Sequence, residues 1–428
     1  MGIGKDMYLR RVVDAELDTL FTELPAIAIE GAKGVGKTET AARRSKTVHD
    51  LDRPGELDLV TADPYRILSG EPPILIDEWQ RFPQSWDLVR RAVDSDRAPS
   101  RFLLAGSATP RDQGRHSGAG RIVRVRMRPL TLAERSGGNY SVSFSKLISG
   151  ERGPVEGTTS FSLQDYAREV CISGFPGLRG LSLRAGRAQL DGYIDQIIDH
   201  DFPDMAQPVR FPDTLRRWMA AYAAATSTSA SFETIRAAAT PGEASKPAKP
   251  TTQVYRDILT RLWIVDPVPA WLPTRNHLHR LASAPKHHLV DPALAARLLG
   301  IDPDGLLEAN PVPGVVVRDG ALLGQLFESL VTLDVRVYAQ NTEASLYHFR
   351  THRGEREIDL IVERGDHRIV AIEVKLKHTI NDNDVRHLHW LSDQIGSDLL
   401  DAVVVTTGPY AYRRNDGIAV VPASLLGP

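Results

Sequence analysis

The sequence holds almost no cysteine and carries no strong charge of either sign. Cys171 is the single cysteine among 428 residues, so the chain cannot form an internal disulfide, and a reducing compartment is expected. The formal net charge is −2, from 52 basic and 54 acidic side chains. No field of the whole molecule therefore attracts nucleic acid or an anionic membrane, and such binding would need a local basic patch.

Long apolar runs are also missing. No uninterrupted apolar stretch approaches the roughly 20 residues of a membrane helix, and the first residues, from Met1 to Asp6, contain no apolar signal core. We therefore expect a cytoplasmic protein without membrane attachment. Hydrophobic residues make up 42% of the chain and charged residues 25%, which is typical of a globular protein with a buried core.

Short apolar strands alternate with helices over the first third of the chain. Helical patterns cover residues 8–21, 38–45 and 85–93. The predicted strands are residues 26–30, 48–51, 74–77, 102–105 and 122–127. Strands separated by helices predict an α/β fold with a parallel sheet that is covered on both faces.

Composition divides the chain into further parts. Residues 136–160 are rich in Gly, Ser and Thr, and we interpret them as a linker or surface excursion that follows a first domain of residues 1–135. Residues 161–310 are mainly helical. Helix and strand patterns return in residues 311–428 and predict a second α/β domain.

Residues 31–38 carry the most specific motif. A predicted strand runs into Gly31-Ala32-Lys33-Gly34-Val35-Gly36-Lys37-Thr38, and a predicted helix follows. In this pattern the glycines let backbone N–H groups turn towards phosphates, and the helix N-terminus adds positive potential. Lys37 is expected to reach the β- and γ-phosphates, and Thr38 to ligate Mg²⁺. We therefore predict a P-loop that binds ATP, with Mg²⁺ as cofactor.

Two further strand ends complete the predicted nucleotide site. Asp77 ends one strand and would hold Mg²⁺ directly or through water, while the adjacent Glu78 would polarise the attacking water. Ser107 ends another strand and could sense the γ-phosphate, although a plain turn explains this segment equally well. Arg121 could contact phosphate in the same chain or across a subunit boundary, but a solvated arginine is the simpler interpretation.

These motifs resemble those of the AAA-type ATPases of prokaryotes that carry a C-terminal domain of unknown function. The resemblance extends to Ser173-Gly-Phe-Pro-Gly177, to residues 193–201 and to Pro285-Lys286-His-His-Leu-Val-Asp291, and so spans nearly the whole chain. Lys33 departs from the family pattern, which usually has Arg there, but no phosphate ligand is lost. The resemblance implies ATP hydrolysis and is compatible with a homo-oligomer or a protein partner.

The middle of the chain offers a candidate DNA contact. Residues 210–263 predict three helices, followed by a strand at residues 262–268, and this order resembles the winged-helix segment of the same family. Eight Lys/Arg and four Asp/Glu give the segment a net charge of +4, which is compatible with binding to DNA phosphates. A helical bundle used for packing explains it slightly better, because Arg256, Arg261 and Gln253 alone could address DNA from the last helix.

Four charged residues stand out near the end of the chain: Glu328, Asp359, Glu373 and Lys375. Residues 357–363 and 368–375 alternate between polar and apolar, which predicts a hairpin. Asp359 would then lie opposite Glu373, within a one-residue uncertainty in register. Glu373 and Lys375 are two residues apart, so they project from one face of the strand.

This spacing is similar to the core of the PD-(D/E)xK nucleases. The resemblance implies that Asp359 and Glu373 bind Mg²⁺, that Lys375 acts as base or charge stabiliser, and that Glu328 is the helix carboxylate. A half-buried strand with a structural salt bridge explains the same pattern. The fold we expect is nuclease-like, and nuclease activity stays an open alternative.

Three hypotheses of function follow from these observations. The first is a Mg²⁺-dependent ATPase whose nucleotide state moves the C-terminal domains. The second is a DNA-binding, metal-dependent nuclease that ATP regulates. The third is a slow nucleotide-dependent switch or scaffold that recruits a partner.

Overall fold

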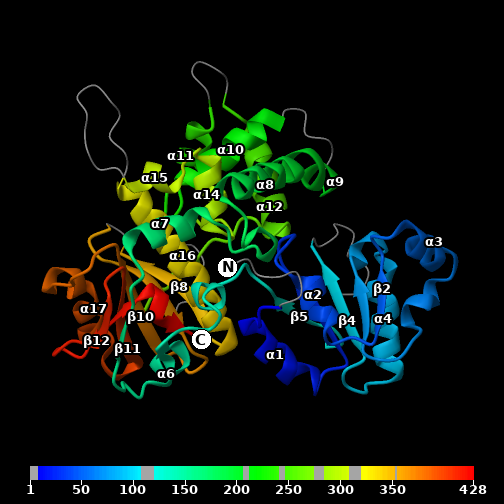
Figure 1. Ribbon diagram of the computed structural model, residues 1–428, viewed down its shortest axis with the longest axis horizontal. Coiled ribbons are helices and arrows are strands. Elements are labelled where there is room, and N and C mark those ends of the chain that lie inside the picture. Colours follow the sequence, from blue (N-terminus) through cyan, green and yellow to red (C-terminus); the bar gives the residue numbers. More distant parts are fainter. Residues whose placement is uncertain are drawn as a thin grey trace.

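The computed structural model describes residues 8–107, 120–205, 212–240, 246–273, 284–307, 320–351 and 354–428. Its elements gather in three parts (Figure 1). The N-terminal part, drawn in blue, and the C-terminal part, in orange and red, each contain a sheet, and the helical middle part, in green, lies above both.

Five parallel strands form the N-terminal sheet in the order β2-β3-β4-β1-β5. Their bounds are β1 (Ala26–Glu30), β2 (Thr47–Asp50), β3 (Ile74–Asp77), β4 (Phe102–Gly106) and β5 (Val123–Arg126). Every residue of β1, β3 and β4 is buried, as expected for inner strands of a parallel sheet that is covered on both faces. The predicted α/β fold is confirmed, and all five strands agree with their predicted ranges within one residue at each end.

Helices cover both faces of this sheet. Their bounds are α1 (Val12–Phe21), α2 (Lys37–Ala42), α3 (Pro54–Ala62) and α4 (Gln84–Ser95), with short 3₁₀ turns at Pro64–Leu68 and Trp79–Arg81. Side chains alternate along the strands, so Ala26 and Ala28 pack in the same cluster as Trp86 of α4. Ile27 and Ile29 face the other way, into a core that continues through the middle part.

The middle part is built almost wholly from helices. They are α7 (Leu163–Cys171), α8 (Leu183–Gln196), α9 (Phe202–Met205), α10 (Pro212–Ala224), α11 (Phe232–Ala238), α12 (Lys249–Arg261), α14 (Pro292–Leu298) and α15 (Pro303–Leu307), with a π-helical turn, η4, at Ile197–Asp201. The three helices predicted within residues 210–263 are confirmed as α10, α11 and α12. The predicted strand after them occurs as two antiparallel bridges, Val265 with Leu289 and Val268 with Lys286.

A seven-stranded mixed sheet dominates the C-terminal part, in the order β7-β12-β13-β11-β10-β9-β8. The bounds are β7 (Gly157–Thr158), β8 (Ser345–Arg350), β9 (Glu357–Glu363), β10 (Ile369–Lys375), β11 (Leu399–Thr406), β12 (Tyr410–Arg413) and β13 (Ala419–Pro422). The long helix α16 (Gly320–Asn341) and the helix α17 (Asp382–Ile395) pack against this sheet. The expected hairpin is present, because β9 and β10 pair antiparallel.

The interpretation of residues 136–160 as a linker or surface excursion was wrong. β7 lies within this stretch and extends the C-terminal sheet by pairing with β12, and β6 (Val142–Ser143) pairs with β14 (Leu426–Gly427). Between them, α6 (Phe144–Ser149) buries Phe144, Leu147 and Ile148. Gly, Ser and Thr dominate the stretch because its strands are only two residues long and offer few places for large apolar side chains.

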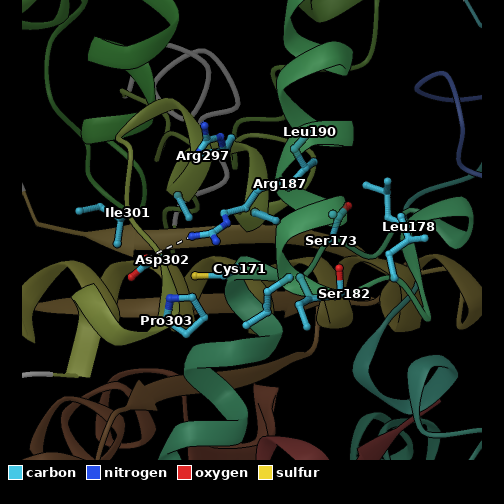
Figure 2. Close-up of a pocket in the computed structure, with 16 residues that line it drawn as sticks. Cys171, Ser173, Leu178, Ser182, Arg187, Leu190, Arg297, Ile301, Asp302 and Pro303 are labelled. Atoms are coloured by element: carbon cyan, nitrogen blue, oxygen red, sulfur yellow. Dashed lines mark hydrogen bonds and ion pairs between the residues drawn. The ribbon is translucent and has the colours of Figure 1, made fainter. Parts of the chain in front are cut away.

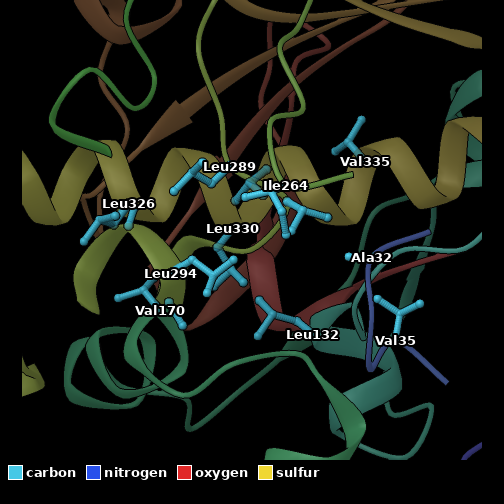
Figure 3. Close-up of a cluster of buried hydrophobic side chains, with 14 of the residues drawn as sticks. Ala32, Val35, Leu132, Val170, Ile264, Leu289, Leu294, Leu326, Leu330 and Val335 are labelled. Atoms are coloured by element: carbon cyan, nitrogen blue, oxygen red, sulfur yellow. The ribbon is translucent and has the colours of Figure 1, made fainter. Parts of the chain in front are cut away.

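One buried apolar cluster joins the three parts (Figure 3). Side chains from each part meet around α16, among them Ala32, Val35, Val170, Ile264, Leu289, Leu294, Leu326, Leu330 and Val335. Two of these residues, Ala32 and Val35, belong to the predicted P-loop. The loop therefore shares one buried apolar cluster with side chains of the middle and C-terminal parts. Within the described residues, no helix is both long and apolar enough to cross a membrane.

Candidate functional site

The predicted P-loop connects the end of β1 to the start of α2. A Cβ atom on Gly31 would lie 2.1 Å from the carbonyl oxygen of Met127, so the close approach of the two backbones requires glycine there. Gly36 has a φ of 102°, a conformation that side chains with a Cβ rarely adopt. Both glycines thus serve the turn that carries the chain around the predicted phosphate site.

Lys37, Thr38 and Asp77 lie together at the carboxyl ends of β1 and β3. The Lys37 Nζ atom donates hydrogen bonds to the carbonyl oxygens of Gly31 and Ala32, both at 2.9 Å, and burial lowers the pKa of Lys37 to about 8. The Thr38 hydroxyl donates to Asp77 Oδ1 at 3.0 Å, and burial raises the pKa of Asp77 to about 6. A hydroxyl and a carboxylate in contact are ligands that suit Mg²⁺ in nucleotide sites.

Glu78 stands next to this pair in a constrained position. Its backbone has a φ of 50°, in the left-handed region that residues other than glycine seldom enter outside turns and functional sites. The Gln80 amide donates to Glu78 Oε2, and the Ser107 hydroxyl donates to Glu78 Oε1 at 3.4 Å. Ser107 directly follows β4, which lies between β1 and β3, so the structure brings it to the predicted site. No sequence motif pointed to Gln80.

An open cavity of about 510 Å³ lies beside these residues, a volume within the usual range for small-molecule sites. Lys33, Glu78 and Ser107 line one side of it, while Tyr193 and Asp201 of the middle part line the other. The Tyr193 hydroxyl donates to the Lys33 carbonyl oxygen at 3.0 Å, and Lys33 Nζ lies 3.9 Å from Asp201 Oδ1. The middle part thus forms a wall of the candidate nucleotide site.

The segments that carry the family resemblance meet beside the P-loop. The Asp291 carboxylate accepts hydrogen bonds from the Ser173 hydroxyl at 2.9 Å and from the Gly174 amide at 2.7 Å. The ring of Phe175, in the same turn, packs against Tyr193 with 4.9 Å between ring centroids. A Cβ atom on Gly34 would lie 3.9 Å from the Phe175 ring. These residues therefore support the loop from the side of the middle part.

Arg11 also supports this loop, and sequence reasoning missed it. This side chain is 4% exposed. Its Nη1 atom donates to the Val35 carbonyl oxygen at 2.8 Å, and its Nε atom pairs with Glu134 Oε1 at 3.0 Å. Nothing in the local sequence distinguishes this arginine from a surface residue, because its partners are distant along the chain.

Arg121 lies at the end of the N-terminal sheet where β1 and β5 begin, opposite the end that carries the P-loop. β5 runs parallel to β1, with Val123 paired to Ile27, so Arg121 precedes β5 beside the start of β1, whereas the P-loop follows its end. Arg121 Nε pairs with Asp94 Oδ1 of α4 at 2.8 Å. The structure therefore does not bring Arg121 to the P-loop of the same chain, and a contact across a subunit boundary stays a prediction.

Comparison with known families agrees with this geometry. Residues 23–136 match the model of an AAA domain. The N-terminal part is thus similar to an AAA domain. After this segment, residues 163–305 match a domain of unknown function (DUF8612), and residues 323–426 match another (DUF4143).

Relatives of nearly full length also occur. Uncharacterized proteins of Mycobacterium tuberculosis and Mycobacterium bovis are each 29% identical to this chain over 429 residues, which covers 97% of this chain and 84% of theirs. Among solved structures, the Walker-type ATPase of Pyrococcus abyssi aligns with a TM-score of 0.41 and 15% identity, over 69% of this chain and 97% of that one.

The structure brings together the four charged residues singled out in the C-terminal part. The register of β9 and β10 pairs Leu360 with Ile372, and its continuation places Asp359 opposite Glu373, within the predicted uncertainty. Lys375 Nζ lies 2.5 Å from Glu373 Oε2 and 3.8 Å from Asp359 Oδ2. Glu328 faces this group from α16, and burial raises the pKa of its carboxyl to about 8.

A residue that was not assigned to this cluster lies at its centre. Lys286, which comes from the middle part, places its Nζ atom 2.9 Å from Glu328 Oε1, 3.2 Å from Glu357 Oε1 and 3.2 Å from Asp359 Oδ1. Burial opposes its positive charge, but Glu328, Asp359 and Glu357 together raise the pKa of Lys286 above its usual value. The only sequence signal was the family segment that contains Pro285 and Lys286, which gave no role.

A second, smaller cavity lies between α7, α8 and α14 (Figure 2). Its volume is about 30 Å³, which leaves room for little more than ordered water. Its rim includes an ion pair between Arg187 and Asp302 at 3.3 Å. Burial raises the pKa of Cys171 in its wall to about 12, so the thiol stays protonated and unreactive. We assign no ligand to this cavity.

Proposed function

We propose that this protein is a Mg²⁺-dependent ATPase that converts ATP to ADP and phosphate and passes its nucleotide state to the middle and C-terminal parts. The observation that carries the proposal is the hydrogen bond from the Thr38 hydroxyl to Asp77, at 3.0 Å. It joins the P-loop to the end of β3, and Lys37 and Glu78 are the chain neighbours of these two residues. This is the arrangement that phosphoryl transfer to water needs.

Each side chain has a distinct role in this proposal. Lys37 binds the β- and γ-phosphates with its ammonium group, and Thr38 and Asp77 hold Mg²⁺. Glu78 orients the attacking water and takes up its proton, while Ser107 restrains the Glu78 carboxylate through the 3.4 Å contact. Bound Mg²⁺ supplies positive charge that neutralises the phosphates.

The contacts between the AAA domain and the middle part support the coupling. Tyr193 touches the P-loop backbone through the Lys33 carbonyl, at 3.0 Å, and Asp201 lies near the Lys33 ammonium group. The acceptor of the Tyr193 hydrogen bond, Lys33, belongs to the P-loop, which would surround the phosphates of bound ATP. A shift of the loop on phosphate binding would therefore move α8 and η4 or break their contacts.

An ATPase assay on matched variants tests the proposal. Lys37→Ala should abolish ATP binding and turnover. Glu78→Gln should keep binding but lower turnover by about 10²- to 10⁴-fold, because the water loses its general base. Lys46→Ala is the control, since this exposed lysine pairs with Glu71 at the surface. Wild-type protein that neither binds nor hydrolyses ATP would rule the proposal out.

A second candidate function is DNA binding by the middle part. α11 and α12 enclose an open cavity of about 270 Å³ that Arg236, Lys249 and Arg256 line. Arg236 is paired with Glu233 in the same opening, and Lys249 and Arg256 add positive charge that suits a phosphate backbone. Lys249→Ala should weaken the binding of duplex DNA in fluorescence anisotropy and reduce its salt slope by about one. An affinity equal to that of Lys46→Ala would remove this candidate.

The same reagents separate an ATPase motor from a slow switch. ATP turnover that rises on addition of DNA would join the two functions above. Turnover that is slow and indifferent to DNA, together with ATP-dependent retention of a protein partner or of a second copy of this chain, would favour the switch.

A further inference from the structure

The carboxylate cluster of the C-terminal part already contains a cation. In the nuclease core that this cluster resembles, a divalent metal lies between the carboxylates. Here the Lys286 ammonium occupies that place, with Glu328, Glu357 and Asp359 at 2.9, 3.2 and 3.2 Å. The fourth carboxylate, Glu373, is engaged by Lys375 at 2.5 Å.

This donor set does not fit a metal ion. A hard divalent cation binds carboxylate oxygens at about 2.0–2.6 Å, and the Lys286 nitrogen fills the position from which a metal would reach Glu328 and Asp359. In addition, the described part of the chain contains no group of three His, Cys, Asp or Glu side chains placed to hold a metal. The resemblance to a nuclease core therefore does not extend to a metal-binding site.

Lys286 is fixed in this position. Its side chain is 1% exposed, and its backbone forms two hydrogen bonds with Val268, at 2.9 and 2.8 Å. The adjacent His287 donates its backbone N–H to Thr228 at 2.8 Å, and His288 contacts the Ser329 hydroxyl at 3.2 Å. Withdrawal of the Lys286 backbone from the cluster would thus require the bridges of the middle part to open.

The two sides of the cluster come from different parts of the molecule. Lys286 lies in the segment that matches DUF8612, whereas Glu328, Asp359 and Glu373 lie in the segment that matches DUF4143. The ion pairs are therefore contacts between two matched segments. A buried cation with three carboxylate partners holds those segments in one register, since any displacement leaves buried charges without partners.

We propose that Lys286 is a built-in counterion that replaces the metal of a nuclease-like centre. The cluster then serves as an ionic lock between the middle and C-terminal parts and does not bind divalent metal or cleave nucleic acid. Asp359 and Glu373 are, on this proposal, structural partners of Lys286 and Lys375.

Isothermal titration calorimetry of nucleotide-free protein with Mn²⁺ tests this proposal. The proteins compared are wild type, Asp359→Asn, Lys286→Met and the double variant Lys286→Met/Asp359→Asn. Wild type and Asp359→Asn should give the same titration, because the lysine excludes metal from the cluster. Lys286→Met should gain one Mn²⁺ site, and the double variant should lose it. Lys46→Met controls for removal of a lysine charge at the surface.

Thermal melting provides a second readout of the same variants. Mn²⁺ should raise the melting temperature of Lys286→Met and leave that of wild type unchanged, because the metal restores the missing charge. The proposal is overturned if wild type binds Mn²⁺ at a site that Asp359→Asn removes. It is also overturned if folded Lys286→Met gains no site. The wild-type comparison decides the matter even if Lys286→Met does not fold.

Discussion

Replacing Asp266 with asparagine would test how the N-terminal part is joined to the remaining chain. Asp266 is 5% exposed, and its carboxylate pairs with Arg126 at 3.1 Å, Arg128 at 3.1 Å and Arg336 at 2.9 Å. Arg126 ends β5 and Arg128 follows it, while Arg336 lies on α16. One carboxylate of the middle part thus connects all three parts.

The expected cost follows from the charges left behind. Burial opposes the charge of Asp266, but the three guanidinium groups together lower its pKa below the usual range, so the carboxylate is ionised. Asparagine keeps the shape and one acceptor oxygen, yet it leaves three guanidinium groups close together without their counterion. Removing one partner of a buried ion pair costs about 3–5 kcal/mol. We expect the free energy of unfolding to fall by about 3 kcal/mol or more.

Urea unfolding followed by tryptophan fluorescence measures this loss. Trp263 is a local reporter, because the Arg126 guanidinium lies 4.5 Å from its ring centroid. A chain of this size need not unfold in one step, so the comparison uses the midpoint of the first transition at an unchanged slope.

The control is Asp52→Asn, because Asp52 pairs with Arg81 where both side chains are more than half exposed. This change should cost less than about 1 kcal/mol. An Asp266→Asn loss no larger than that of Asp52→Asn would refute the reasoning.

Three further predictions concern the P-loop. Burial lowers the pKa of Lys37 to about 8, and phosphate binding needs the charged form of this side chain. In a fluorescent-nucleotide titration, ATP affinity should therefore fall above pH 8 by up to about tenfold per pH unit. An affinity that stays constant across this pH range would contradict the prediction. Gly31→Ala places a methyl group 2.1 Å from the Met127 carbonyl oxygen and should weaken ATP binding about tenfold or more; Gly55→Ala, with no atom within 4 Å, should not. Tyr193→Phe removes a hydrogen bond to the loop and should lower the free energy of unfolding by about 0.5–1.5 kcal/mol in urea; no loss would argue against the coupling contact.

The N-terminal sheet could be predicted closely because its signals are local. β1 and β3 coincide with the predicted ranges, since each is a run of buried apolar residues that begins after proline and ends at a charged side chain. The P-loop, Asp77 and Glu78 follow those strand ends directly. Once the strands are parallel, their carboxyl ends must share one edge of the sheet, so the assembly of the site follows from the order of motifs.

The remaining features depend on contacts that no local pattern reveals. Gln80 reaches Glu78 only because the chain turns sharply after β3. Residues 136–160 looked like a linker because their pairing partners lie at the other end of the sequence. Lys286 resembled any lysine of a loop, and only the folded arrangement brings it among the carboxylates of Glu328 and Asp359.

The pairing of β6 with β14 has a consequence for how the chain is made. Leu426 pairs with Val142 in a two-stranded sheet, although the two residues are 284 positions apart in the sequence. During translation, β6 and β7 therefore have no strand partners, and the apolar side of α6 has no sheet to pack on, until nearly all the described chain has left the ribosome. Such late, non-local pairing slows folding and exposes strand edges to other chains. Production of the C-terminal segment without residues 136–160 should accordingly leave the β12 edge of the seven-stranded sheet unpaired and promote aggregation.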